Sequence, residues 1–524
     1  MKTTIPHSAF RIPHSTQGIV YLVGAGPGDP KLITVKGLEA LQRADVVIYD
    51  HLVSPRLLEQ CRPGAQIIYA GKEQGEHAKS QHQINRLLIR YAKAGKAVVR
   101  LKGGDPVLFG RGGEEALACR AAGVQAEFVP GVTSAIAAPA YAGIPVTHRL
   151  CASSVAIVTG HEDPGKPDTA IRWAQVATAT DTLVILMGVG TLGTIAQRLI
   201  EHGRAKQTPC AAIEWGTWPQ QRTVVGTLST IAARCRQARL KPPAVIVVGE
   251  VVKLRKYLTW FERAPLFGKR IVVTRPAEKA DQLADQLEAL GAEVVRLPAI
   301  ELAAVDANGL FHRAVDELPD TDWVFFTSPE GIGWFERLLK TARKDLRILH
   351  GCHLGAIGPK TAASIEQRGL HVDYLPTAYS QEGIVKGLAA RRLRGQHAVI
   401  FSAEGSREVL EDGLRRLGMD VCRVPIYRTV VPETLARHVK QAFADRVDVV
   451  TATSSSCVEH LVRTMRSCGL SRRVKALRFA SIGPVTSATI RRMGARVAIQ
   501  AKVSTIEGLV DALSHRTASS AQTV

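Results

Sequence analysis

The segment GIVYLVGAGPGDPKLITVKGLEAL (residues 18–41) decides the fold class of the first part of the chain. Its apolar, partly β-branched start predicts a strand, and a helical pattern begins near Leu32. The Gly24–Asp29 bend between them has the composition of a loop in which backbone approaches a ligand closely. The segment therefore predicts an α/β domain whose first loop lies at a binding site.

Length and composition extend this prediction to the whole chain. The 524 residues are 46% hydrophobic and 5% aromatic, which is typical of several layered α/β domains. No apolar run reaches the ~20 residues that a membrane span needs, and the N-terminus has no signal-peptide core. The nine cysteines include no CxxC pair, which favours a reducing compartment and no zinc site. We expect a soluble cytoplasmic protein without a metal or a membrane partner.

The formal net charge of +21 indicates either a solvated basic surface or an anionic partner. Lys and Arg are spread along the chain, and no zinc finger, RNP motif or helix-turn-helix pattern accompanies them. We therefore expect no nucleic acid partner. A small molecule that carries many carboxylates stays possible.

Two segments in the first half resemble nucleotide-binding loops without completing their patterns. GHEDPGKP (160–167) has Pro167 where a phosphate loop needs Ser or Thr. Gly188, Gly190 and Gly193 form GxGxxG, but they lie in the middle of the domain and the expected acidic partner is poorly placed. We interpret the second segment as a turn that brings backbone near a ligand.

Five further loops share the character of the opening segment. They are rich in Gly, Pro, Asp, Lys and Arg, and each follows an expected strand: ADVVIYDHLV (44–53), AGK (70–72), VVRLKGGDPVLFGRGGEE (98–115), VPGVTSA (129–135) and GIPVTHR (143–149). The sequence therefore predicts one dense active site.

A break at residues 252–268 precedes a second half that contains an internal repeat. Residues 269–302 align with 397–429, 322–339 with 448–465, and 354–388 with 479–513. A repeat of about 125 residues is too long for a solenoid and predicts two similar α/β lobes with a ligand cleft between them. Ser and Thr at strand ends either bind carboxylates or phosphates there or only cap helices.

Residues 18–255 resemble uroporphyrinogen-III C-methyltransferase of the tetrapyrrole methylase family. The resemblance rests on GAGPGD, YDxLV, RLKGGDPxxFGRGGEE, PGVTSA, PVTHR and the ENGT-like EWGT at 214–217. Residues 268–515 resemble uroporphyrinogen-III synthase through TRP (274–276), FTS (326–328), PxYRT (425–429) and IGP (482–484). The resemblance implies an α/β chain: a two-lobed tetrapyrrole methylase fold, a linker at 256–267, and a synthase domain of two flavodoxin-like lobes. Flexible tails are expected at residues 1–17 and 516–524.

The methylase resemblance implies that S-adenosylmethionine is the ligand of the first loop. It places contacts to this methyl donor on Pro27, Gly103, Gly104, Asp105, Leu108, Thr133, Ser134, Met187 and Gly216. It assigns Asp50 as a base, Lys72 as an acid, and Arg111 as a catalytic residue that also holds substrate carboxylates. Arg100 and Arg149 are expected to contact the substrate. From the residues alone, Asp50 is equally well explained as the cap of a helix near Ser54, and Lys72 as a surface lysine. Ser134 and Ser80 depart from the common family pattern.

The synthase resemblance implies ring closure of linear hydroxymethylbilane with loss of water and without a metal or cofactor. Tyr427 matches the tyrosine thought to assist departure of the hydroxyl. Further contacts to the substrate are expected from Arg275, Ser328, Ser380, Arg407, Ser454 and Thr486. Val485 stands where the family has threonine, so a role at that position is doubtful.

Together the two resemblances predict a bifunctional enzyme that closes hydroxymethylbilane to uroporphyrinogen III and methylates it twice, at C-2 and C-7, to precorrin-2. No dehydrogenase or ferrochelatase module precedes Gly18, so we expect the chain to stop at this product, on the way to sirohaem or cobalamin. The family also implies a homodimer through the methyltransferase half. The alternatives are a methylase of another tetrapyrrole or of RNA, and a second half that is a non-catalytic two-lobed ligand sensor.

Overall fold

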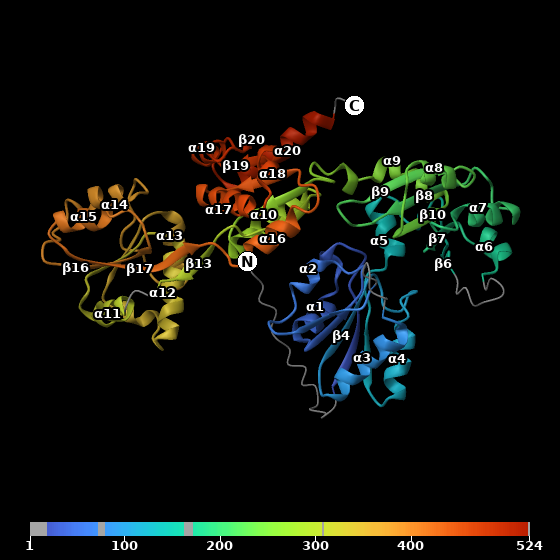
Figure 1. The fold of residues 1–524 in the computed structure, drawn as a ribbon, viewed down its shortest axis with the longest axis horizontal. Coiled ribbons are helices and arrows are strands. Elements are labelled where there is room, and N and C mark those ends of the chain that lie inside the picture. Colours follow the sequence, from blue (N-terminus) through green and yellow to red (C-terminus); the bar gives the residue numbers. More distant parts are fainter. Residues whose placement is uncertain (1–17, 72–78, 162–170, 306–308, 522–524) are drawn as a thin grey trace. The chain divides into compact units, whose positions relative to one another are not determined.

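The computed structural model describes residues 18–71, 79–161, 171–305 and 309–521. The chain forms two compact units, Met1–Lys269 with Ala289–Glu293 and Arg270–Glu288 with Val294–Val524. Each unit contains two lobes, and each lobe is built on a five-stranded sheet (Figure 1). Within the described ranges, no helix is both long and apolar enough to cross a membrane.

Lobe 1, in the first unit, has a wholly parallel sheet in the order β3-β2-β4-β1-β5. Its strands are β1 (Ile19–Gly24), β2 (Val46–Tyr49), β3 (Gln66–Tyr69), β4 (Val98–Lys102) and β5 (Gln125–Val129). The helices between them are α1 (Val35–Arg43), α2 (Pro55–Leu58), α3 (Gln81–Lys93) and α4 (Gly112–Ala121). The parallel register brings the carboxyl ends of the strands to one edge of the sheet.

Helices cover both faces of this sheet (Figure 1), and for this reason its inner strands are largely apolar, although β4 also carries Arg100 and Lys102. Val20 and Leu22 pack against α3 and α4, whereas Val23 packs against α1 and α2 on the other face. Alternating side chains of one strand thus enter two different cores. The helix expected from Leu32 begins later, because Thr34 caps α1 by accepting a hydrogen bond from the Gly37 N–H at 3.1 Å.

Lobe 2 completes the first unit with a mixed sheet in the order β6-β7-β10-β8-β9. Its strands are β6 (Val155–Thr159), β7 (Thr182–Leu186), β8 (Pro209–Glu214), β9 (Arg222–Thr227) and β10 (Ala244–Val248). Helix α5 (Ser134–Tyr141) covers one face, and α6 (Trp173–Ala179), α7 (Leu192–Glu201) and α8 (Ile231–Gln237) cover the other.

Residues 256–267, expected to be a linker, pack on the first unit instead. They include most of α9 (Arg255–Leu258) and a short 3₁₀ turn, Phe261–Arg263. The rings of Trp260 and Phe261 lie edge-on to Tyr141, with 4.9 Å between ring centroids in each pair. The carboxylate of Glu262 accepts hydrogen bonds from Arg255, Gln221 and Thr223. Aromatic packing and these polar contacts fix the segment.

In the second unit the two lobes do not correspond to the two repeats, because each lobe takes strands from both. Lobe 3 has the order β12-β11-β18-β19-β20, with β11 (Arg270–Val273), β12 (Glu293–Arg296), β18 (Val449–Ala452), β19 (Arg478–Ser481) and β20 (Arg496–Gln500). Lobe 4 has the order β13-β17-β16-β14-β15, with β13 (Glu301–Ala304), β14 (Trp323–Phe326), β15 (His353–Ala356), β16 (His397–Ala403) and β17 (Asp420–Val430). Each repeat therefore gives its first two strands to one lobe and its last three strands to the other.

Lobe 3 has the strand order 2-1-3-4-5 of a flavodoxin-like sheet when its strands are numbered along the chain, which confirms the predicted fold class. Its helices are α10 (Ala277–Ala289), α16 (Leu435–Ala442), α17 (Ser455–Ser467), α18 (Ser471–Ala476), α19 (Pro484–Arg492) and α20 (Ile506–Ala521). Lobe 4 carries α11 (Leu310–Glu317), α12 (Pro329–Thr341), α13 (Pro359–Glu366), α14 (Gln381–Leu388) and α15 (Val409–Arg416). Helix α20 runs through most of the expected tail 516–524.

Candidate active sites

A cleft of about 840 Å³ lies between lobes 1 and 2 of the first unit. Most of the residues predicted to contact the methyl donor line it: Pro27, Gly103, Gly104, Leu108, Ser134, Met187 and Gly216. Asp105 and Thr133, predicted for the same role, do not. The turn at Met187 and Gly190, identified from its GxGxxG pattern, also lines this cleft.

The glycines of the opening loop serve mainly to let loops pack against each other. Gly26 and Gly104 exchange backbone hydrogen bonds of 3.2 and 2.7 Å, and both have left-handed φ angles, +77° and +71°. A side chain at Gly24 would collide with the backbone of Gly131. Pro27 is the residue of this loop that reaches the cleft lining. Backbone approaches backbone here, and the ligand surface is formed by the loops together.

Asp105 and Thr133 hold these loops from behind. The Asp105 carboxylate accepts hydrogen bonds from the N–H groups of Val107 (2.9 Å), Leu108 (3.0 Å) and Gly131 (3.0 Å). Thr133 caps α5 through the Ala135 N–H at 3.2 Å. Both side chains position the lining residues beside them. Their direct contact with the donor stays a prediction.

Strained backbone gathers around the cleft. Phe109, Met187 and Trp215 line it with φ angles of +53°, +57° and +48°, which bulky side chains rarely adopt. Trp215 lies edge-on to His51, with ring centroids 6.3 Å apart, and the Trp218 indole donates a 3.1 Å hydrogen bond to the Pro27 carbonyl. We had not predicted these aromatic residues as part of the site, although His51 and Trp215 lie inside the quoted motifs YDHLV and EWGT.

A buried charge cluster lies beneath the same strand ends. Oε1 of the fully buried Glu115 accepts from Arg100 Nε (3.2 Å), Lys102 Nζ (3.1 Å) and Gln81 Nε2 (3.1 Å). Arg100 also pairs with Asp50 across 3.5 Å. Burial lowers the pKa of Lys102, and the neighbouring Arg100 lowers it further, while Glu115 opposes both. The cluster thus fixes Asp50 through a buried arginine.

The residues predicted to act in catalysis or to contact the substrate of the methylase lie in different surroundings. Asp50 does not cap α2, whose N-cap is Ser54; its carboxylate accepts instead from the Leu52 N–H at 3.2 Å. Arg100 is buried in the charge cluster described above and does not line the cleft. Arg111 lies at the start of α4 and pairs with Glu114 at 2.7 Å, and Arg149 is exposed. Lys72 lies outside the described residues, as does the end of the phosphate-loop-like segment, 162–167.

In the second unit, Tyr427 and Ser328 form the centre of the predicted synthase site. Their hydroxyl oxygens are 2.8 Å apart, and Ser328 also caps α12 by accepting from the Gly331 N–H at 3.0 Å. Tyr427 is 7% exposed, and burial raises the pKa of its phenol while the Ser328 hydrogen bond opposes that shift. The phenol is therefore a protonated group held at the end of β14 by a helix cap.

The remaining predicted synthase residues mostly have structural partners. Ser380 and Ser454 cap α14 and α17. Capping is thus confirmed for the strand-end serines Ser328 and Ser454. Thr486 is buried in the first turn of α19, while the neighbouring Val485 is 75% exposed. Arg407 pairs with Glu382 at 2.7 Å.

Arg275 differs from this pattern, whereas Thr505, which was not among the predicted residues, follows it. The Arg275 Nη1 atom is buried without a hydrogen-bond partner, and burial lowers the pKa of its guanidinium. Such an atom is a natural contact for an anion. Thr505 caps the Gly508 N–H at 3.0 Å as Ser380 caps α14, and the internal repeat could have identified it.

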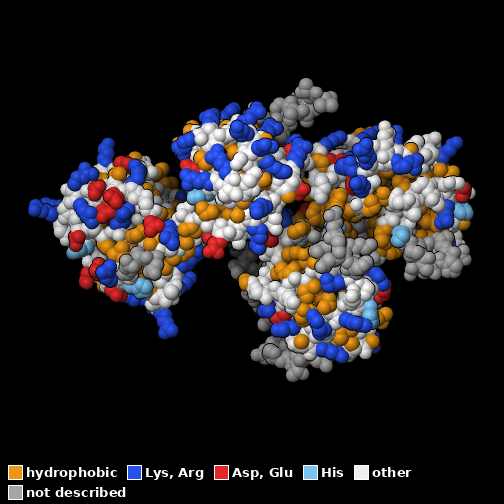
Figure 2. Space-filling model, viewed as in Figure 1, with side chains coloured by type: hydrophobic (Ala, Val, Ile, Leu, Met, Phe, Trp, Pro, Cys, Tyr) orange, Lys and Arg blue, Asp and Glu red, His pale blue; other side chains and the backbone are white. Residues whose placement is uncertain are grey.

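Metal ligands are not grouped in the described part of the chain. There, no set of three His, Cys, Asp or Glu side chains converges as metal ligands do. Lys and Arg side chains are scattered over the visible surface of both units (Figure 2).

Comparison with known proteins assigns each unit to a family. Residues 19–232 match the model of the tetrapyrrole (corrin/porphyrin) methylases, and residues 281–511 match that of uroporphyrinogen-III synthase HemD. The porphyrin biosynthesis protein HemD of Ruminiclostridium josui is 36% identical over 95% of this chain and 97% of its own length. The uroporphyrinogen-III C-methyltransferase of Bacillus subtilis is 44% identical over 68% of this chain and 72% of its own. That of Priestia megaterium is 55% identical over 45% of this chain and 98% of its own.

The two family matches follow one another along this chain, and the match to the Ruminiclostridium josui protein extends over almost the whole of both chains. The chain therefore belongs to the family of tetrapyrrole biosynthesis proteins that join a tetrapyrrole methylase to a uroporphyrinogen-III synthase.

Proposed function

We propose that this chain closes hydroxymethylbilane to uroporphyrinogen III in its second unit and methylates that product at C-2 and C-7 in its first unit, giving precorrin-2. The observation that carries the proposal is the presence of two different sites on one chain: a glycine-lined cleft, and a buried phenol held by a helix cap. The first suits a folded methyl donor, and the second suits proton transfer to a leaving hydroxyl.

S-adenosylmethionine is the methyl donor we propose for the cleft, and two glycines support the fit. A side chain built at Gly104 would meet only the Ser134 nitrogen, at 3.8 Å, and one at Gly190 would meet nothing within 4 Å. Both positions line the cleft, so the space that their missing side chains leave is open to a ligand. When bound, the donor supplies an electrophilic methyl group.

The role of the methylase residues is to align the two reactants and to remove a proton. Lobes 1 and 2 both line the cleft, and alignment of this kind lowers the barrier of a bimolecular transfer. We propose Asp50 as the group that accepts the proton from the substrate, since Arg100 and the Leu52 N–H fix its carboxylate. Lys72 remains the proposed acid, and Arg111 and Arg149 remain proposed contacts to substrate carboxylates.

In the synthase unit, we propose that Tyr427 donates its proton to the departing hydroxyl of hydroxymethylbilane, which leaves as water. Ser328 fixes the phenol, and the unpaired Nη1 of Arg275 suits one of the eight substrate carboxylates. The alternative of a non-catalytic ligand sensor would leave this buried, oriented phenol without a task.

The test of the synthase half uses the purified chain and hydroxymethylbilane without methyl donor. We expect uroporphyrinogen III to form much faster than the spontaneous isomer I. If isomer I alone forms at the background rate, the second unit is not a synthase and the sensor alternative replaces it.

Two further parts of the proposal concern the assembly and the compartment. We propose a homodimer through the methylase unit, tested by light scattering on the full chain and on a chain with Leu150→Glu, a position that is 91% exposed. We also propose a cytoplasmic protein, which the nine free cysteines support.

A further inference from the structure

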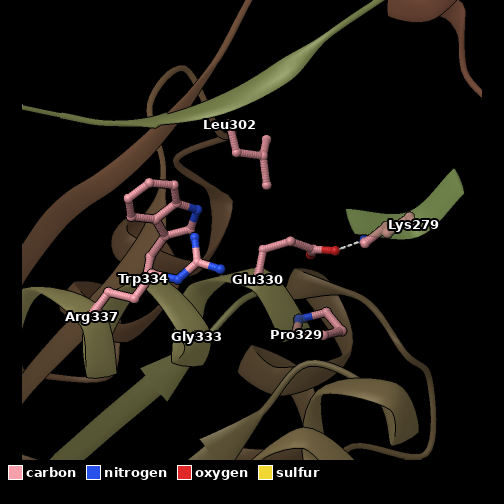
Figure 3. Close-up of a pocket in the computed structure, with 7 residues that line it drawn as sticks. All are labelled: Lys279, Leu302, Pro329, Glu330, Gly333, Trp334 and Arg337. Atoms are coloured by element: carbon pink, nitrogen blue, oxygen red, sulfur yellow. Dashed lines mark ion pairs between the residues drawn. The ribbon is translucent and has the colours of Figure 1, made fainter. Parts of the chain in front are cut away.

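A separate pocket of about 260 Å³ opens in the second unit, between helix α10 of lobe 3 and helix α12 of lobe 4. Figure 3 shows its walls: Lys279 from α10, Leu302 from β13, and Glu330, Gly333, Trp334 and Arg337 from α12. Pro329, the first residue of α12, lines the pocket as well. Glu330, Gly333, Trp334 and Arg337 are spaced three and four apart, so they share one face of the helix. The opposite face, with Ile332 and Phe335, is buried in the core of lobe 4.

The pocket adjoins the Tyr427–Ser328 pair. In the antiparallel ladder of β13 and β17, Ala304 lies opposite Tyr427 and Leu302 lies opposite Thr429. Residues two apart on a strand, and partners directly opposite, project from the same face of a sheet. Leu302 and Tyr427 therefore lie on one face of the ribbon. Ser328, which contacts the phenol, precedes Glu330 by two residues on the same helix.

The pocket has two cationic walls around one carboxylate. Lys279 forms an ion pair with Glu330, whose side chain is 19% exposed. The Arg337 guanidinium lies over the Trp334 ring, 5.1 Å from its centroid, on the side of Glu330 in Figure 3. A planar aromatic ring and a stacked guanidinium together hold a carboxylate site in a defined orientation.

We propose that this pocket is a carboxylate subsite of the synthase, which takes one acetate or propionate arm of the linear tetrapyrrole between Lys279 and Arg337. In the substrate-free protein, the Glu330 carboxylate is paired with the Lys279 ammonium, and the carboxylate of the substrate arm displaces Glu330 from that pair. This inference rests on the proposed synthase function. An ion pair that is partly open to solvent is weak enough to be exchanged in this way.

The alternative is that the Lys279–Glu330 pair only fastens lobe 3 to lobe 4. The two explanations predict different directions for the change in KM. If Glu330 competes with the substrate, Glu330→Gln lowers the KM for hydroxymethylbilane, whereas Lys279→Gln and Arg337→Gln each raise it about tenfold, as loss of a charge-assisted hydrogen bond does. If the pair is only a fastener, Glu330→Gln and Lys279→Gln shift KM in the same direction.

A pocket-filling variant gives an independent measurement. A Cβ atom at Gly333 would meet only the end of Arg368, at 3.7 Å, so a side chain can start there. Gly333 lines the pocket, so Gly333→Leu puts an apolar side chain at its wall and favours the helix. We expect it to raise KM with no loss of thermal stability. Lys344→Gln is the matched control, because Lys344 pairs with Asp316 on the surface of the same unit.

The measurement is the initial rate of uroporphyrinogen III formation by the full chain over a range of hydroxymethylbilane concentrations. Opposite KM shifts for Glu330→Gln and Lys279→Gln, with a raised KM for Gly333→Leu, support the subsite. Unchanged or parallel shifts overturn it while the wild-type chain still makes isomer III. If the wild-type chain makes only isomer I, it is the proposed function that fails.

Discussion

Replacing Glu115 by Gln tests the buried charge cluster of lobe 1 most severely. The carboxylate is fully buried, and its Oε1 atom receives hydrogen bonds from Arg100, Lys102 and Gln81. Its Oε2 atom is buried without a hydrogen-bond partner, so an amide of the same shape fits. With Asp50 included, the cluster has two negative and two positive charges. Gln removes one negative charge and leaves two buried cations facing one carboxylate.

Leaving a buried charge without its partner typically costs about 3–5 kcal/mol. We therefore expect Glu115→Gln to lower the free energy of unfolding of the first unit by about 3 kcal/mol or more, which is roughly a hundredfold in the folding equilibrium. Lys102→Met added to this variant removes one of the stranded cations. The double variant should then be more stable than Glu115→Gln alone, because the methionine stem fills the space of the lysine stem.

The assay is a urea titration of the full chain, followed by hydrogen–deuterium exchange of peptides from β1 and β4, with peptides from β14 as the reference for the second unit. A loss below about 1 kcal/mol for Glu115→Gln, or a double variant no more stable than the single one, would refute the reasoning. Both outcomes would mean that solvent or relaxation already compensates these charges.

Three further outcomes are expected. Lys102 has a lowered pKa in the folded state, so the unfolded chain binds this proton more tightly. The free energy of unfolding therefore rises as the pH increases from the folded pKa towards about 10.4, the ordinary pKa of lysine. Lys102→Met should flatten this rise, measured as urea midpoints over the same pH range. Gly104→Ala forces alanine to φ +71°, which should lower the free energy of unfolding by about 1–2 kcal/mol and weaken the binding of S-adenosylhomocysteine measured by calorimetry. Gly113→Ala is the control, because it lies in open space on α4 and should stabilise the unit slightly. Tyr427→Phe removes the phenol proton, so the rate of isomer III formation falls more than tenfold while methylation of supplied uroporphyrinogen III is unchanged; equal loss of both would contradict separate sites.

Much of the first unit could be predicted from local patterns. Strands that are buried on both faces are largely apolar, and the loops at their carboxyl ends carry the polar groups. For this reason the segments around Gly24–Asp29 and Gly103–Asp105 identified both the sheet and the cleft. The loop patterns alone could not tell which of these residues line the cleft and which support it from behind. Asp105 has a carboxylate suited to a ligand, yet it accepts hydrogen bonds from two backbone N–H groups of its own loop and from one of another loop.

The buried network was invisible in the sequence for a physical reason. Arg100, Lys102 and Glu115 are residue types that normally lie in water, and only the approach of α4 to β4 makes their burial possible. The repeat in the second half predicted two similar lobes, and these are present. The exchange of strands between them depends on long-range pairing, such as that of β11 with β18, which no local pattern encodes.

Side-chain pairing also separated residues that look alike in sequence. Arg407 and Arg111 each pair with a neighbouring glutamate, while Arg275 has a guanidinium nitrogen that is buried and unpaired. Trp215 holds a left-handed backbone angle that its residue type disfavours, and a sequence pattern gives no sign of it.

The central claim, that one chain carries out both reactions in order, is tested most directly by one incubation. Purified full-length protein is supplied with hydroxymethylbilane and S-adenosylmethionine labelled with ¹³C in its methyl group, and the product is examined by mass spectrometry and ¹³C NMR. We predict a product two labelled methyl groups heavier than uroporphyrinogen III, with the labels at C-2 and C-7 and the side-chain order of isomer III. Product of the isomer I series, or uroporphyrinogen III that carries no label, would contradict the claim.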